Sequence, residues 1–384
     1  MTVKTRIFIE AHMFDHGFEG SATFVAGLYR ALLAAHPDCY ELIIGGLFPE
    51  KAINALGSPP QAVAARYRSK NRFARLACDV PRIMRQKKPD FAHFQYFTPI
   101  TKSCDWIVTI HDVLFNDFPD YFPPNYRRMR NVLFPISARR ADILTTVSLY
   151  SRDRISYWYR IIPGRIHVTP NGVEVAGVGN AERAQARIEG QPEGQYLICV
   201  SRFEPRKNQV AVLRAFLAME LWRKGLSMVF VGSKTLESPA FDAALAQAPD
   251  AARRAVHLLS GVSSEALTGL VSGAKAAIYP SLAEGFGLPP LEALALGVPS
   301  ICAKVTAMAD FDVLDPFFFD PNVAGSLEEK LGSVLSDPVN ASLAATEGAQ
   351  RVVEEYTWQM SAEILHRAIE ARLASRARVR RICP

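Results

Sequence analysis

Residues 275–302, KAAIYPSLAEGFGLPPLEALALGVPSIC, carry the pattern that decides the fold. A short apolar run at 276–279 predicts a β-strand, and a glycine-rich loop follows it. Pro289 and Pro290 suit the first positions of a helix, because those positions need no N–H donor. A second apolar run at 298–302 predicts the next strand. The order strand, loop, helix, strand is typical of a parallel α/β sheet.

The loop and the start of this helix together have the chemistry of an anion site. Gly285 and Gly287 flank Phe286, so the backbone there can approach a ligand closely. The N-terminus of a helix offers unpaired N–H donors and the positive end of the helix dipole. Phosphate is the usual anion at such a place, so the segment predicts a phosphate-binding loop.

Two carboxylates bracket the loop. Glu284 lies inside it and Glu292 lies in the following helix. A carboxylate accepts hydrogen bonds from hydroxyl groups, and a ligand with central phosphates and hydroxyl-bearing sugars at both ends is a nucleotide sugar. The pair alone leaves a second interpretation open, in which Glu284 is solvated and Glu292 only complements the helix dipole.

The whole segment resembles the E-x7-E region of family 4 glycosyltransferases, which are retaining enzymes of the GT-B fold. The resemblance implies that Glu284 contacts the donor sugar and that Glu292 holds the ribose hydroxyls. It also implies that backbone amides of Phe286, Gly287 and Leu288 lie near the sugar and the phosphates.

The second half of the chain contains further positions that match this family. Arg202 and Lys207 bracket a predicted strand-to-helix turn in SRFEPRKNQ, where two cations can neutralise a diphosphate. They resemble the family's Arg…Lys pair. By the same resemblance, Gly232 follows a strand and would approach the donor, and the backbone near Val262 would read the base.

The first half offers two candidates. In DHGFEGSATF, Gly17 and Gly20 resemble the family's glycine-rich turn, and Gly20 is the better candidate; a simple loop with Ser21 as helix N-cap is the alternative. His111 follows a strand at 106–110, and open α/β sheets bind ligands at this end of their strands. The family places a His here near the donor sugar, and TIHDVLFNDFPDYF resembles its mannosyltransferase-like branch. A core or capping His is the alternative.

Strands alternate with helices in both halves of this 384-residue chain, which predicts the α/β class and two cores. With the resemblance, the expected architecture is GT-B, two Rossmann-like, doubly wound domains that face a cleft. We expect an acceptor-binding domain at 1–178, a linker within 176–195 and a nucleotide-sugar domain at 192–360. A helix and basic tail at 361–384 would return to the first domain.

The composition indicates a cytoplasmic protein. No apolar run approaches the ~18–20 residues that span a bilayer. The six cysteines lack C-x-x-C or metal-type spacing, which favours reduced thiols.

The net charge of +6 is concentrated in residues 66–88, where nine basic residues stand against Asp79 alone. Aromatic and aliphatic residues interleave with them. This pattern predicts attachment to an anionic membrane surface, on the inner face of the cytoplasmic membrane, with a solvated helix face as the alternative. No nucleic-acid module accompanies the charge, so we expect no nucleic-acid partner.

Other classes fit less well. A dinucleotide enzyme needs G-x-G-x-x-G, but Pro290 stands where that pattern needs its last glycine, and no Walker A sequence occurs. Asp310 and Asp312 form an Asp-x-Asp, but in a connecting segment, so we expect no metal. A non-catalytic sugar-nucleotide-binding protein, an epimerase or a phosphorylase on the same fold stays open.

The sequence therefore predicts a metal-independent, retaining glycosyltransferase without a cofactor. GDP-mannose is the favoured donor, and a glycan or lipid-linked saccharide of surface polysaccharide synthesis is the expected acceptor. A UDP-sugar is the alternative donor.

Overall fold

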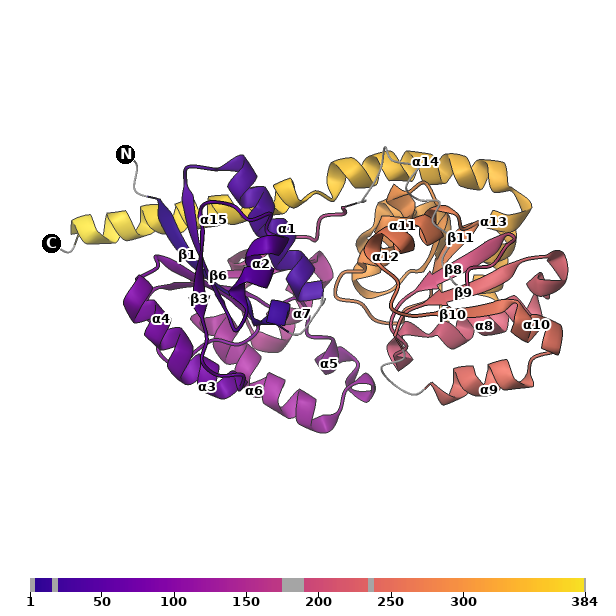
Figure 1. Cartoon of the computed structure of the whole chain (residues 1–384), viewed down its shortest axis with the longest axis horizontal. Helices are drawn as coiled ribbons and strands as arrows, with labels where there is room; N and C mark the ends of the chain where they lie inside the picture. Colours follow the sequence, from indigo (N-terminus) through magenta and orange to yellow (C-terminus); the bar gives the residue numbers. More distant parts are fainter. Residues whose placement is uncertain (1–3, 16–19, 175–189, 234–237, 383–384) are drawn as a thin grey trace. The chain divides into compact units, whose positions relative to one another are not determined.

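The computed structural model describes residues 4–15, 20–174, 190–233 and 238–382. The chain divides into two compact units (Figure 1). Unit 1 consists of Met1–Gly172 together with Thr357–Pro384, and unit 2 consists of Val173–Tyr356. The expected linker at 176–195 lies largely outside the described residues.

Unit 1 is built on a seven-stranded parallel sheet with the strand order β3-β2-β1-β4-β5-β6-β7. The strands are β1 (Thr5–Glu10), β2 (Tyr40–Gly46), β3 (Ala62–Arg66), β4 (Phe91–Gln95), β5 (Asp105–Thr109), β6 (Ile143–Thr146) and β7 (Ile166–Val168). The helices are α1 (Gly20–Ala35), α2 (Pro49–Ala55), α3 (Arg72–Ala74), the π-helical turn η2 (Arg75–Asp79), α4 (Val80–Lys87), α5 (Leu114–Asp117), α6 (Pro124–Arg140), α7 (Leu149–Tyr159) and α15 (Trp358–Ile382).

Unit 2 is built on a six-stranded parallel sheet with the strand order β10-β9-β8-β11-β12-β13. The strands are β8 (Tyr196–Val200), β9 (Ser227–Val231), β10 (Val256–Leu259), β11 (Ala276–Tyr279), β12 (Ser300–Ala303) and β13 (Phe318–Phe319). The helices are α8 (Gln209–Ala218), α9 (Pro239–Gln247), α10 (Asp250–Arg254), α11 (Ser264–Ser272), α12 (Leu288–Ala295), α13 (Ser326–Ser336) and α14 (Pro338–Glu355).

Both sheets reverse their strand order beside the first strand of the unit, as doubly wound Rossmann-like domains do. The predicted α/β fold of two such domains is confirmed. Strands β8, β10 and β11 have the predicted bounds. Among the described residues, no helix is both long and apolar enough to cross a membrane.

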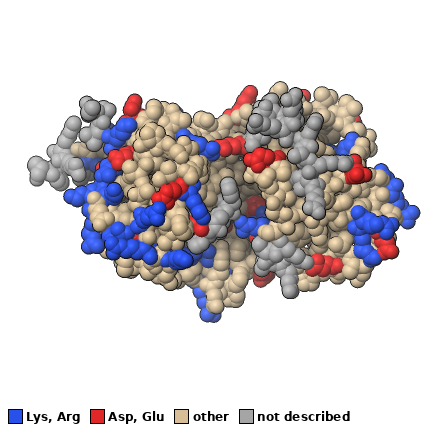
Figure 2. Space-filling model, in the orientation of Figure 1, with Lys and Arg blue, Asp and Glu red and all other residues tan. Residues whose placement is uncertain are grey.

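Positive side chains are unevenly distributed on the surface. On the face shown in Figure 2, Lys and Arg gather over unit 1 in the region of α3 and α4. Exposed cations of this region are Arg66, Arg68, Lys70, Arg85 and Lys88.

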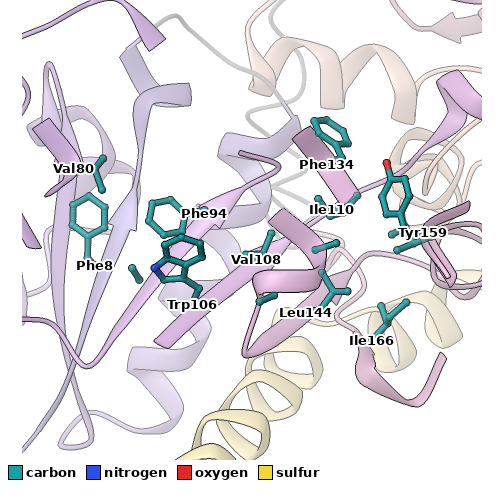
Figure 3. Close-up of a cluster of buried hydrophobic side chains, with 14 of the residues drawn as sticks. Phe8, Val80, Phe94, Trp106, Val108, Ile110, Phe134, Leu144, Tyr159 and Ile166 are labelled. Atoms are coloured by element: carbon teal, nitrogen blue, oxygen red, sulfur yellow. The ribbon is translucent and has the colours of Figure 1, made fainter. Parts of the chain in front are cut away.

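The core of unit 1 consists of aromatic and branched side chains from β1, β4, β5 and β6 and from the helices that cover them (Figure 3). Phe94 and Trp106 meet edge to face with ring centroids 5.5 Å apart. Strands buried on both faces read as nearly continuous apolar runs, which explains why β5 was predictable from its sequence.

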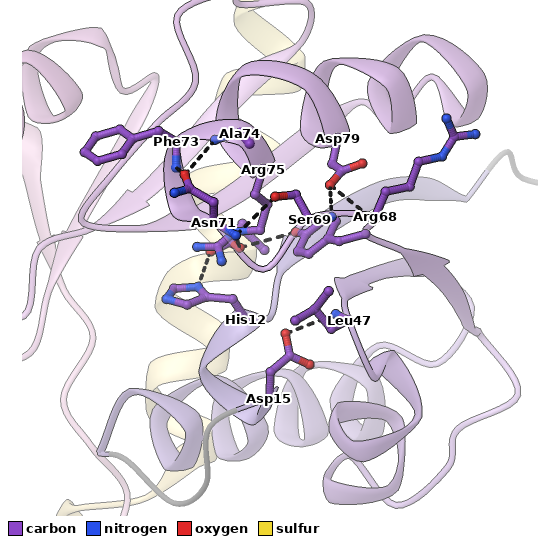
Figure 4. A network of polar contacts seen from close by, with 12 residues as sticks. His12, Asp15, Leu47, Arg68, Ser69, Asn71, Phe73, Ala74, Arg75 and Asp79 are labelled. Atoms are coloured by element: carbon purple, nitrogen blue, oxygen red, sulfur yellow. Dashed lines mark hydrogen bonds and ion pairs between the residues drawn. The ribbon is translucent and has the colours of Figure 1, made fainter.

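The basic segment is less exposed than its sequence suggests (Figure 4). Asp79 accepts hydrogen bonds from the backbone N–H groups of Arg68 and Ser69, at 2.9 and 3.0 Å. Arg75 is buried, and its Nε forms an ion pair with Glu10 Oε1 at 3.0 Å. Tyr67 is buried as well. Part of the predicted basic surface is therefore an internal network of unit 1.

The last helix, α15, packs on α1 in unit 1. Trp358 lies so close to Gly27 that a Cβ atom there would fall 2.1 Å from the indole ring. Further along the helix, Arg372 forms ion pairs with Asp105 at 2.6 Å and with Asp142 at 2.7 Å.

Helix α15 continues to Ile382, so the helix also includes most of the segment that we expected as a basic tail. Arg376 adds an ion pair with Asp105 at 2.7 Å. Asp105 begins β5 and Asp142 directly precedes β6, so these ion pairs hold the C-terminal part of α15 on unit 1. The hydrophobic periodicity of the sequence does not reveal such ion pairs.

Candidate active site

The loop between β11 and α12 has the geometry that its sequence predicts. Gly287 is the N-cap residue of α12 and has a φ of +105°, which favours glycine. A Cβ atom at this position would also lie 2.8 Å from the Met308 side chain. Pro289 and Pro290 follow within the first turn of the eight-residue helix. The backbone of Phe286, Gly287 and Leu288 thus forms the entry to a helix N-terminus.

Glu284, which lies in this loop, is held by two cations from the turn before α8. Lys207 Nζ donates to Glu284 Oε1, and Arg206 Nη1 donates to Oε2 at 2.9 Å. The Glu284 N–H donates to Thr306 Oγ1 at 2.9 Å, which fixes the backbone. Burial by itself raises the pKa of Glu284. The positive charges of Lys207 and Arg206 outweigh this effect and bring the pKa below its ordinary value of 4.5, to about 2. Glu284 is therefore an ionised carboxylate at neutral pH.

Glu292 lies in α12 in a different environment. Burial raises the pKa of its carboxyl group. In the described part of the chain, no Lys, Arg or His forms an ion pair with it. A partly buried carboxylate without a cation is suited to hydrogen-bond donors that carry no charge, such as hydroxyl groups.

The structure brings Arg206, not Arg202, to Glu284. Both arginines precede α8, but Arg206 lies in the short 3-10 turn η6 (Pro205–Lys207). Arg202 is exposed, and its backbone carbonyl accepts a hydrogen bond from Gln209 Nε2 at 2.7 Å. The contact of Arg206 was missed; its only trace in the sequence is its place beside Lys207.

Gly232 and Val262 lie at the same edge of the sheet as the Glu284 loop, because they follow β9 and β10. A Cβ atom on Gly232 would fall 2.0 Å from the carbonyl oxygen of Ser201, so only glycine permits this approach of two backbones. Ser263 accepts a hydrogen bond from Ala266 N at 3.3 Å and caps α11.

In unit 1, His111 follows β5 as predicted. Its Nε2 lies 2.6 Å from Gln95 Oε1, and its ring packs edge-on against Phe24 with centroids 4.9 Å apart. Burial lowers the pKa of His111 to about 4, so the imidazole is neutral at pH 7.

Gln95 continues into a buried polar network that we did not predict. Its Nε2 lies 3.1 Å from His93 Nε2, which also lies 2.7 Å from Thr109 Oγ1. The other nitrogen of His93, Nδ1, lies 2.8 Å from the Tyr29 hydroxyl. Alternation of polar residues in the buried strand β4 (His93, Gln95) is the trace of this network in the sequence.

Gly20 is the first residue of α1, and a Cβ atom there would meet nothing within 4 Å. The structure therefore gives no steric reason for glycine at this position. Ser21 lies inside the helix, so it does not act as the N-cap of α1. Gly17 lies outside the described residues.

The Asp-x-Asp sequence lies in two 3-10 turns, η8 (Thr306–Asp310) and η9 (Asp312–Phe317). Asp312 forms an ion pair with Arg351 at 2.9 Å. Across the residues that the structure describes, no group of three or more His, Cys, Asp or Glu side chains could hold a metal ion.

Sequence comparison identifies the family. The profile of the family "Glycosyl transferases group 1" matches residues 181–378, and that of "Glycosyltransferase Family 4" matches residues 18–176. The chain belongs to the glycosyl transferases group 1 and is a glycosyltransferase.

Several curated relatives are mannosyltransferases. The chain is 26% identical over 265 residues to the O-antigen chain mannosyltransferase B of Escherichia coli. The aligned region covers 66% of this chain and 67% of that protein. The chain is 29% identical over 227 residues to the MMP alpha-(1->4)-mannosyltransferase of Mycolicibacterium hassiacum. That match covers 58% of this chain and 52% of the relative, so the chain spans about half of that protein's length.

Solved structures confirm the GT-B fold. The sucrose-phosphate synthase of Thermosynechococcus elongatus superposes with a TM-score of 0.75 at 17% identity, covering 97% of this chain and 100% of that one. Anabaena HepE in complex with UDP and glucose superposes with a TM-score of 0.71 at 14% identity, covering 96% and 100%.

Proposed function

We propose that the protein is a retaining hexosyltransferase that uses GDP-mannose and acts on a glycan or lipid-linked saccharide in surface polysaccharide synthesis. The observation that carries the proposal is the ionised carboxylate of Glu284, held beside Lys207 at the loop that leads into α12. A cation, a carboxylate and a helix N-terminus together suit a sugar attached to a diphosphate. Several relatives are mannosyltransferases, which favours mannose as the transferred sugar.

In this proposal each group has one task. Lys207 and Arg202 neutralise the charge that develops on the diphosphate as its bond to the sugar breaks. Glu284 orients the sugar, Glu292 binds the ribose hydroxyls, and His111 approaches the sugar as a neutral imidazole. The acceptor oxygen forms its bond to the anomeric carbon on the face that the diphosphate leaves. Its proton passes to an oxygen of the departing phosphate.

The donor is tested by thermal unfolding with GDP-mannose, UDP-glucose, UDP-galactose and ADP-glucose, because a bound ligand stabilises the folded state by mass action. We expect GDP-mannose to raise the melting temperature most, and acceptor-dependent release of GDP to accompany it. A larger rise of the melting temperature with a UDP-sugar would show that this UDP-sugar, not GDP-mannose, is the preferred donor. Binding without any transfer or donor hydrolysis would favour a non-catalytic protein.

We propose that the reaction needs no divalent metal. The ion pair of Asp312 with Arg351 supports this, since it engages one carboxylate of the Asp-x-Asp sequence. Turnover should be unchanged in EDTA. Loss of turnover in EDTA, restored by manganese, contradicts the proposal and returns Asp310 and Asp312 to consideration.

We further propose that the protein works at the cytoplasmic face of a membrane, attached through part of 66–88. Arg66, Arg68 and Lys70 are exposed, and the Phe73 side chain is 62% exposed beside them. Each such cation contributes roughly 1 kcal/mol near an anionic leaflet. Arg75 takes no part, because it is buried against Glu10.

Co-sedimentation with liposomes tests the attachment. Binding should require anionic lipid, weaken with salt and fall when Arg66, Arg68 and Lys70 are changed together to Ser. A matched control changes Arg223, Lys224 and Arg254, three exposed cations of unit 2, to Ser. Failure to bind anionic liposomes at low salt would leave a solvated face and favour an acceptor without a lipid.

A further inference from the structure

Arg206 connects the turn η6 to three consecutive residues of the Glu284 loop. The N–H of Leu282 donates to the carbonyl oxygen of Arg206 at 2.7 Å. Arg206 Nη1 donates to the carbonyl oxygen of Ala283 and to Glu284 Oε2, each at 2.9 Å. Backbone and guanidinium of one residue therefore fix both the path of the loop and the orientation of its carboxylate.

The guanidinium is held from its other side as well. Arg206 Nη2 forms an ion pair with Glu204 Oε2 at 3.0 Å. The planar fork of an arginine holds such acceptors in a fixed geometry, so its contacts with Ala283, Glu284 and Glu204 restrain one another. Arg206 is thus committed to protein acceptors.

Lys207 differs from Arg206 in this respect. Its ammonium group has three hydrogen-bond donors on a flexible stem. Among the residues that the structure describes, the Lys207 side chain has one hydrogen-bond partner, Glu284 Oε1. Lys207 can therefore exchange Glu284 for a phosphate oxygen, whereas Arg206 would have to leave three acceptors to do so.

If Lys207 moves to a phosphate oxygen, Glu284 loses the positive charge of Lys207. Only 13% of the Glu284 side chain is exposed, and a poorly solvated carboxylate that loses its counter-charge tends to take up a proton. A protonated Glu284 would lose much of its strength as an acceptor for a sugar hydroxyl.

We infer that Arg206 is a positioning residue, which keeps Glu284 ionised and correctly oriented while Lys207 binds the donor diphosphate. This inference rests on the proposed function, since it assumes that the site binds a nucleotide sugar. The two neighbouring cations then have separate tasks: Lys207 acts on the substrate, and Arg206 acts through Glu284. The lowered pKa of Glu284, to which Arg206 contributes, is consistent with this division.

The test compares Arg206→Met and Arg206→Lys with wild type. Arg206→Met should lower turnover at pH 7 about tenfold or more and leave the affinity for GDP within about twofold. It should also move the acid limb of the pH–turnover profile upward by about one pH unit or more, because Glu284 loses a nearby positive charge. Arg206→Lys restores the charge without the fork, so it should recover part of both changes.

A second readout does not depend on turnover. Carbon-13 NMR of glutamate carboxyl groups, with the Glu284 signal assigned by its loss in Glu284→Gln, reports the titration of Glu284 directly. In Arg206→Met this titration should move upward by about one pH unit or more. Arg223→Met is the matched control, since Arg223 is an exposed arginine of the same unit that pairs only with Glu220 at 3.0 Å among the described residues.

If the titration of Glu284 does not move in Arg206→Met, the inference is overturned. It is also overturned if Arg206→Met loses GDP affinity and turnover to the same extent, because that result means that Arg206 only holds the loop together. If Arg206→Met does not fold, Arg206→Lys provides the comparison, because it keeps the charge but removes the planar fork, and it should still shift the profile upward in part. An unshifted profile in Arg206→Lys then overturns the inference. Absence of donor binding and transfer in wild type would defeat the proposed function instead.

Discussion

Two carboxylates of this protein occupy similar places but have different surroundings. Glu10 ends β1 in unit 1, and Glu284 follows β11 in unit 2. Each faces two basic side chains: Arg75 and His12 for Glu10, Lys207 and Arg206 for Glu284. Their exposure separates them, since the Glu10 and Arg75 side chains are 3% and 4% exposed, whereas Glu284 and Lys207 are 13% and 15% exposed.

The difference indicates what each cluster can do. The Glu10–Arg75 ion pair joins η2 to the end of β1, and Tyr67 adds a hydrogen bond to Glu10 at 3.3 Å. Both ionic partners are closed off from solvent, so this cluster stabilises unit 1. The Glu284 cluster is more exposed, as the proposed contact of Lys207 with a ligand requires. Accessibility, more than charge, distinguishes the candidate active site from the structural ion pair.

The largest expected effect tests the structural cluster. Among the described residues, Arg75→Met leaves the buried Glu10 with His12 as its one basic partner. Breaking a buried ion pair in this way costs about 3–5 kcal/mol. Urea unfolding should show this loss, and turnover per folded molecule should stay at the wild-type value. The double variant Glu10→Gln/Arg75→Met removes the unpaired charge and should recover part of the stability. A stable Arg75→Met protein with impaired turnover would place the Glu10 cluster in the active site.

The next effect concerns the Glu284 cluster. Lys207→Ala should lower turnover by at least ~100-fold at saturating donor, a few kcal/mol of lost transition-state stabilisation. Initial-rate kinetics measure this, with the exposed Lys224→Ala as control. Wild-type turnover in Lys207→Ala would remove the proposed role of Lys207.

These two clusters were not equally predictable from the sequence. The loop between β11 and α12 is local, so its glycines and prolines define the structure around Glu284 directly. Arg206 and Glu284 are far apart in sequence, and their contact depends on the parallel neighbours β8 and β11. The burial of Arg75 depends in the same way on contacts with β1, which a count of basic residues in 66–88 does not contain. Local backbone chemistry was therefore predictable, and side-chain partners across strands were not.

Arg202 separates catalysis from stability at one position. Its side chain is exposed, so Arg202→Ala should change the free energy of unfolding by no more than about 0.5 kcal/mol. Turnover should nevertheless fall at least ~100-fold if Arg202 neutralises the departing diphosphate. Unfolding and initial-rate measurements on the same preparation give both values. Wild-type turnover would assign the diphosphate to Lys207 and the helix N-terminus alone.

The smallest expected effect is the pH dependence that Glu284 gives to stability. Its pKa of about 2 lies below the ordinary value of 4.5, so its ion pairs stabilise the folded state fully above about pH 4.5. This contribution is lost as the pH falls toward 2, because the unfolded chain takes up the proton first. Between pH 7 and pH 4 the loss amounts to less than about 1 kcal/mol. Glu284→Gln has no such proton to take up, so its stability should fall less steeply over this range.

Urea unfolding of wild type and Glu284→Gln at pH 7, 5 and 4 measures the difference in slope. The pKa of Glu10 is also low, because the charges of His12 and Arg75 outweigh the effect of burial, but Glu10 is present in both proteins and cancels. Parallel curves would mean that Lys207 and Arg206 do not hold Glu284 ionised in the folded protein. In that case the Glu284 cluster would share ion-pair contacts with the Glu10 cluster but not their effect on the pKa of the carboxylate. The proposal that Arg206 keeps Glu284 ionised while Lys207 binds the diphosphate would then have no electrostatic support.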